Sequence, residues 1–100
     1  MRNKFDLGKV YMTRCVLEAA TSNPVFTEFI WRCMSRHVNG DWGDVCEEDK
    51  QANNDALTHG NDQLLSSFII PLQQPNLPEK LWIITEWDRS CTTVLFPFER

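Results

Sequence analysis

The chain has 100 residues, of which 42% are hydrophobic and 24% are charged, with a formal net charge of −4. This length and composition exclude a disordered chain and indicate a single domain, residues 1–100, with one hydrophobic core. The first residues contain no apolar run long enough for a secretory leader or a spanning helix, so we expect a cytoplasmic protein without a membrane contact.

The first 40 residues predict one strand and two helices. Residues 7–12 (LGKVYM) are typical of a short strand, and residues 13–20 favour one or two helical turns. Asn23 is the expected N-cap of the next helix, with Pro24 at its first position, where a missing N–H costs nothing. This helix should run to Asn39–Gly40. One face of it carries the apolar stripe Phe26, Phe29, Ile30, Cys33 and His37, while Trp31 and Val38 lie off the stripe.

The segment GDWGDVCEED, residues 40–49, predicts a turn followed by a helix start. We expect Asp44 to be the N-cap and Glu47 to complete a capping box three residues later. The helix should continue to His59 and stop at Gly60. Its apolar positions are few, so we expect most of this helix to face water.

The last third of the chain changes to strand periodicity. We predict strands over residues 64–71, 80–88 and 91–98, with a tight turn at 88–91 that pairs the last two as an antiparallel hairpin. Alternation separates Leu81 and Ile83 from Trp82 and Ile84, but either face can be the one that the helices cover. The predicted fold class is α+β: an N-terminal strand, two or three helices, then a C-terminal three-stranded antiparallel meander, with a single layer of helices on the sheet.

Charge is unevenly distributed along the chain. Residues 1–40 hold six cations and three acids, whereas residues 41–62 hold seven acids and one lysine. This acidic middle argues against direct nucleic-acid binding and favours a protein partner with a basic surface. The sequence leaves the oligomeric state open.

The cysteine spacing shows no metal-binding pattern. The four residues lie 18, 13 and 45 positions apart, without a CxxC pair or a suitably spaced histidine. We expect neither a metal site nor a cofactor. The four cysteines should be free thiols: Cys15, Cys33, Cys46 and Cys91.

Three phrases together mark a resemblance to a protein family: RHVNGDWGDVCEEDKQANNDAL, LLSSF and LWIITEWDRSCTTVLFP. The chain resembles small uncharacterised bacterial proteins of this size, carried on chromosomes, plasmids and phages and described as hypothetical or plasmid-related. The resemblance covers most of residues 35–97 and implies an accessory role on mobile elements. Gln63 stands where the family has a basic residue before LLSS.

Two functions fit these features. The interpretation we favour is an acidic accessory protein that binds a basic protein surface. It would inhibit a defence enzyme that handles nucleic acid. Its expected binding residues are Asp41, Trp42, Asp44, Glu47, Glu48, Asp49, Trp87 and Arg89. The alternative is a small metal-dependent hydrolase or nuclease, in which the GDWGD and EWDR turns meet. Its residues would be His37, Asp41, Asp44, Glu86, Asp88 and Arg89.

Two of these side chains have a structural interpretation as well. Arg89 could bind a phosphate, but it is more easily explained by pairing with Glu86, Asp88 or an acid of the GDWGD segment. Trp42 is either an exposed anchor for a partner or a plug beneath the turn between two helices. Its burial distinguishes the two.

Overall fold

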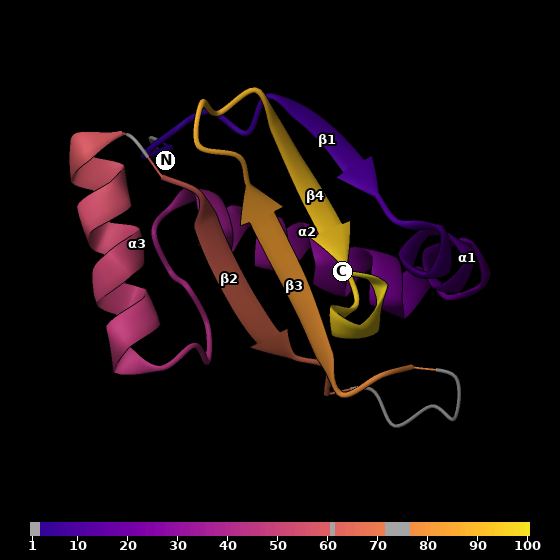
Figure 1. The fold of residues 1–100 in the computed structure, drawn as a ribbon. Coiled ribbons are helices and arrows are strands. Elements are labelled where there is room, and N and C mark those ends of the chain that lie inside the picture. Colours follow the sequence, from indigo (N-terminus) through magenta and orange to yellow (C-terminus); the bar gives the residue numbers. More distant parts are fainter. Residues whose placement is uncertain (1–2, 61, 72–76) are drawn as a thin grey trace.

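The computed structural model describes residues 3–60, 62–71 and 77–100. In this part of the chain, β1 (Lys9–Met12) is followed by α1 (Arg14–Ser22), α2 (Pro24–Val38) and α3 (Glu47–His59). Strands β2 (Leu64–Ile69), β3 (Lys80–Thr85) and β4 (Cys91–Leu95) then precede a short 3₁₀ helix, η1 (Pro97–Glu99). Figure 1 shows α2 behind the sheet and α3 beside β2, at the edge opposite β1. The α+β class is therefore confirmed.

The sheet is mixed, so the predicted arrangement of an N-terminal strand and a simple antiparallel meander is incomplete. Its order is β1-β4-β3-β2. Strands β2, β3 and β4 pair antiparallel as expected, but β1 joins β4 in parallel, with Lys9 opposite Cys91. A parallel neighbour requires a crossover connection, here the whole middle of the chain, and local alternation carries no signal for such a distant pairing.

The helices cover the sheet face that carries Leu81 and Ile83. The largest group of buried side chains joins this face to α1 and α2, and includes Val16, Phe26, Ile30, Cys33, Met34, Phe68, Leu81, Ile83, Val94 and Phe96. On the other face, Ile84 is only 8% exposed and Trp82 is half-buried. A hollow, described below, lies on this second face.

Helix α2 follows its sequence signals closely. The Asn23 side chain accepts hydrogen bonds from the amides of Val25 and Phe26, at 3.1 and 3.2 Å, as an N-cap does. The predicted stripe faces the core, and Trp31 is exposed. The placement of Val38 off the buried side was wrong, because Val38 is buried at the end of the helix.

The start of α3 differs from the prediction. Cys46 is the N-cap, without a side-chain hydrogen bond, and the helix begins at Glu47. Asp44 lies too early because Gly43, with φ of 76°, runs beside β2: the Asp44 amide donates to the Ser67 carbonyl at 2.7 Å. The expected Asp44–Glu47 capping box is therefore wrong. The predicted stop at Gly60 is confirmed by its left-handed φ of 69°.

All three C-terminal strands are shorter than predicted. Strand β3 ends at Thr85 because the turn to β4 begins there, closed by a hydrogen bond from the Glu86 amide to the Cys91 carbonyl. Strand β4 ends at Leu95, since Pro97 starts η1 and has no N–H for a strand ladder. Residues 72–76, between the predicted strands 64–71 and 80–88, lie outside the described residues.

Two further expectations meet direct observations. All four cysteines are free, and each lies in the described part of the chain. A helix long and apolar enough to cross a membrane does not occur among residues 3–60, 62–71 and 77–100.

Candidate functional site: an acidic helix on the sheet edge

Helix α3 presents its acids to water. Glu47, Glu48, Asp49 and Asp55 are all exposed. Within the described residues, only Glu47 among them forms an ion pair, with Lys50 at 3.3 Å. Acids in a first helical turn are stabilised by the helix dipole, which explains how three neighbouring carboxylates are tolerated there. The side of α3 away from the sheet is therefore a convex, negatively charged surface.

Polar side chains attach α3 to the sheet. Asn53 is buried, and its side chain both donates to the Leu65 carbonyl at 2.7 Å and accepts from the Leu65 amide at 3.0 Å. This amide thus pairs with the edge of β2 much as a neighbouring strand would. A second link runs from the Trp42 indole N–H to the Asn54 side-chain oxygen, at 3.0 Å. Because few apolar residues of α3 are buried, these bonds set its position.

Trp42 is a plug rather than an exposed anchor. Its side chain is only 4% exposed, and its ring lies 6.3 Å from the Phe5 ring and 5.7 Å from the His37 ring. The same residue packs with Ala56 and Leu64 in a small second core. Of the two interpretations of Trp42, its burial therefore favours the plug.

Trp87 and Arg89 lie in the β3–β4 turn, next to the C-terminal end of α3. Trp87 is 61% exposed. The Arg89 guanidinium donates to the Ala56 carbonyl at 3.1 Å and to the Asp62 carbonyl at 2.6 Å. Burial lowers the pKa of Arg89 below its ordinary value, since desolvation disfavours the charged form.

The expected pairing of Arg89 with a carboxylate is thus replaced by bonds to backbone carbonyls. Two further bonds, to the Glu86 and Trp87 carbonyls at 3.1 and 3.3 Å, hold the guanidinium inside its own turn. Arg89 accordingly ties the turn that carries the exposed indole to the end of α3, through both of its terminal guanidinium nitrogens.

The two turns proposed for metal chemistry do not meet. Asp44 pairs with Lys80 at the start of β3, with 3.3 Å between the Lys80 nitrogen and a carboxylate oxygen. Glu86 and Asp88 instead follow the end of β3, six or more residues further on. At the rise of an extended strand, this separates the two turns by about 20 Å. A group of three His, Cys, Asp or Glu side chains able to hold a metal ion is absent from the described residues.

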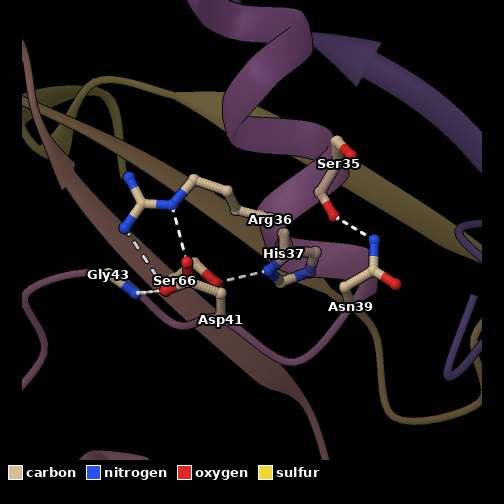
Figure 2. Close-up of polar contacts among 7 residues, drawn as sticks. All are labelled: Ser35, Arg36, His37, Asn39, Asp41, Gly43 and Ser66. Atoms are coloured by element: carbon tan, nitrogen blue, oxygen red, sulfur yellow. Dashed lines mark hydrogen bonds and ion pairs between the residues drawn. The ribbon is translucent and has the colours of Figure 1, made fainter. Parts of the chain in front are cut away.

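Asp41 is held by α2 instead. The Arg36 guanidinium donates to both of its carboxylate oxygens, at 2.8 and 3.3 Å, and the Gly43 amide adds a third bond (Figure 2). The hydrogen bond from Arg36 lowers the pKa of Asp41 below its usual range. Arg36 therefore fixes the start of the GDWGD turn.

His37 lies in a buried polar network that begins at Ser66. Figure 2 shows its Nδ1 atom facing the Ser66 hydroxyl, at 2.5 Å. Its Nε2 atom lies 2.9 Å from the Thr85 hydroxyl, which lies 2.7 Å from the Thr92 hydroxyl. The Thr92 hydroxyl in turn donates to the Leu7 carbonyl at 2.7 Å. His37, Ser66, Thr85 and Thr92 are all fully buried.

The carbonyl at the end of the network fixes every proton in it. A carbonyl only accepts, so Thr92 uses its one proton on Leu7 and must accept from Thr85. Thr85 must then accept from His37, which makes His37 the Nε2–H tautomer and leaves Nδ1 to accept from Ser66. Burial lowers the pKa of His37 to about 3. This neutral, enclosed imidazole is a structural group, not a base that reaches a substrate.

Few local patterns in the sequence indicate these network residues. Ser66 and Thr92 have the pattern of ordinary polar strand positions, and the network becomes visible only when distant strands are placed side by side. The hollow around Ser67 and Trp82, described below, was not predicted for the same reason. Comparison of the chain with models of protein families, with curated proteins and with solved structures found no match.

Proposed function

We propose that this protein acts by binding another protein, using the acidic outer surface of α3 and the exposed Trp87 against a basic surface of its partner. The observation that carries this proposal is the set of water-facing carboxylates on α3, of which Glu48, Asp49 and Asp55 have no ion pair among the described residues. Unpaired charges on a convex surface favour rapid encounter with an oppositely charged surface, and an exposed tryptophan supplies the apolar contact that charges lack.

The rigid attachment of α3 supports a binding role. Asn53 fixes the middle of the helix to β2, and Arg89 fixes its C-terminal end to the turn that carries Trp87. A surface whose backbone is ordered before binding loses less conformational entropy when its partner arrives. The acidic helix and the indole are therefore presented together at a reduced ordering cost.

The partner class we propose is an enzyme that handles nucleic acid. Such enzymes carry basic grooves for phosphates, and an acidic protein surface competes for the same charges. Inhibition of a defence enzyme agrees with the accessory role implied by the resemblance to small plasmid and phage proteins. Hydrolysis by the protein itself receives no support from the separated carboxylates.

The test compares two variants that lose the same charge. Glu48→Gln/Asp55→Asn neutralises two exposed acids of α3, whereas Glu18→Gln/Glu28→Gln neutralises two exposed acids that pair with arginines on α1 and α2. Each immobilised protein is exposed to a lysate of its native host, and retained proteins are identified by mass spectrometry and then purified.

We expect one retained partner, whose affinity falls about tenfold in the α3 variant and changes less than twofold in the control. Added salt should weaken its binding, because exposed charges are screened. The purified partner should lose nuclease or nucleic-acid-binding activity when the protein is added. Equal retention by both variants, or a partner bound independently of salt, would show that α3 is not the binding surface.

A further inference from the structure

A hollow of about 330 Å³ lies between the start of α3 and the sheet face that the helices leave open. Its wall includes Asp44, Asp49, Leu65, Ser67, Lys80 and Trp82. Ser67 and Trp82 are directly opposite each other on β2 and β3, so they form the floor. The segment before α3 forms the side, because it runs along β2 through the bonds of Asp44 and Trp42 to Ser67.

The Ser67 hydroxyl needs a partner that the described residues do not supply. Ser67 is only 5% exposed, and its hydroxyl oxygen has no hydrogen bond with any part of the chain that the structure describes. Its backbone is satisfied, since its amide donates to the Trp42 carbonyl and its carbonyl accepts from the Asp44 amide. Buried polar side chains are nearly always hydrogen-bonded. A lone hydroxyl in the wall of a hollow therefore points to an occupant.

The charges of the wall select a cation. Lys80 is already paired with Asp44, at 3.3 Å. Asp49 lacks an ion pair within residues 3–60, 62–71 and 77–100. One carboxylate of the wall is left without an ion pair, so the side-chain charges of the wall sum to −1 and favour a cation.

The floor of the hollow selects a flat cation with several donors. Trp82 already has the Arg100 guanidinium near its ring, with 5.9 Å from the guanidinium carbon to the ring centroid. The hollow lies on the β2 side of Trp82, because its wall includes Leu65 and Ser67 of β2. A guanidinium can stack on an indole while it donates hydrogen bonds in its plane, which an ammonium group does less well.

We propose that this hollow binds an arginine side chain of the basic partner, with its guanidinium on Trp82 and its N–H groups directed to Ser67 and Asp49. The identity of the occupant rests on the proposed function, because that function supplies the basic partner. The hollow lies at the N-terminal end of the acidic surface of α3, so a partner that covers this surface brings its arginines to the opening.

The direct test uses a small probe instead of the partner. The peptide acetyl-Gly-Arg-Gly-amide is titrated into the ¹⁵N-labelled protein and compared with the same peptide carrying citrulline, which has the shape of arginine without its charge. We expect saturable shifts at the Trp82 indole and the Ser67 amide with arginine only. Shifts that are equal for both peptides, or absent from these two signals, would overturn the proposal.

Three variants locate the binding. Asp49→Asn should lower the affinity for the arginine peptide about threefold. Glu28→Gln, which removes one acid from α2, should leave this affinity unchanged. Ser67→Ala should weaken it too, without unfolding the protein, because the hydroxyl makes no bond that the substitution would break. Equal affinities for Asp49→Asn and Glu28→Gln would also refute an arginine in this hollow.

The outcome is separable from that of the proposed function. If binding of the partner still depends on the acids of α3 but the arginine peptide does not bind, the arginine site in the hollow is refuted. The proposal that the acidic surface of α3 binds a partner is then retained. If the peptide binds but no partner depends on α3, the hollow stands as an arginine site and the proposed function fails.

Discussion

Replacing Thr85 by valine tests the buried network around His37. The two side chains have nearly the same shape, so the substitution removes a hydroxyl without opening a cavity. That hydroxyl accepts from His37 Nε2 at 2.9 Å and donates to Thr92 at 2.7 Å. In the variant, the ring nitrogen of His37 faces a methyl group, and Thr92 retains its bond to the Leu7 carbonyl.

The expected cost follows from the unpaired nitrogen. Leaving a buried donor or acceptor without a partner costs about 1–3 kcal/mol. The added methyl group returns about 0.8 kcal/mol by its burial. We therefore expect Thr85→Val to lower the free energy of unfolding by about 0.2–2.2 kcal/mol, and the melting temperature by about 1–18 °C for a domain of this size. A switch of tautomer does not rescue the bond, since either form of Nε2 then lies unpaired.

Urea unfolding measures this cost, with Thr93→Val as the matched control. Thr93 lies on the other face of β4, opposite Ile84, and is half-buried. The same chemical change there should alter stability by less than about 0.5 kcal/mol. In parallel, ¹⁵N spectra of the unchanged protein should show His37 protonated at Nε2. Equal stabilities for the two variants, or a proton on Nδ1, would refute the deduced network.

Three further predictions concern stability. Because the pKa of His37 is about 3 when folded and 6.5 ordinarily, the unfolded chain binds more protons between these values, so stability should fall as pH drops through this window, by up to about 1.4 kcal/mol per pH unit. Unfolding at successive pH values measures how steeply the free energy of unfolding depends on pH. This dependence should be weaker in His37→Gln than in the unchanged protein, and unaltered in His59→Gln, at an exposed site. Gly43→Ala should cost at least about 2 kcal/mol more than Gly60→Ala in urea unfolding, since both have positive φ but only the Cβ added at Gly43 meets backbone, the Ser67 carbonyl; similar costs would contradict this. Arg89→Gln should cost about 2 kcal/mol and speed amide exchange in the last turn of α3, and unchanged exchange would show that the guanidinium does not hold that turn.

Much of the fold could be predicted because its signals are local. The N-cap at Asn23, the left-handed stop at Gly60 and the tight β3–β4 turn each depend on neighbouring residues. The parallel pairing of β1 depends instead on β4, which lies about 80 residues further along the chain. The predicted start of α3 was wrong because Gly43, just before the helix, pairs with Ser67 at the edge of β2. This tertiary contact outweighed a good capping pattern.

The candidate site could be predicted only in outline. A thin apolar face correctly indicated that α3 is exposed, because hydrophobic patterning reports burial directly. The same reasoning has no means of placing a tryptophan, since its large ring suits both a core and an anchor: Trp42 proved buried and Trp87 exposed. Arg89 escaped prediction because backbone carbonyls, which every sequence has, replaced the expected carboxylates.

The edge of β2 explains why an acidic helix can remain on this protein at all. An open strand edge invites pairing with another chain. Here the backbone of Trp42 and Asp44 pairs with one part of that edge, and the Asn53 side chain satisfies another. Because these polar bonds close the edge from the inner side of α3, its outer side is relieved of any packing requirement. Carboxylates can therefore accumulate there without weakening the core, and the fold obtains a charged surface that is rigid and free to bind.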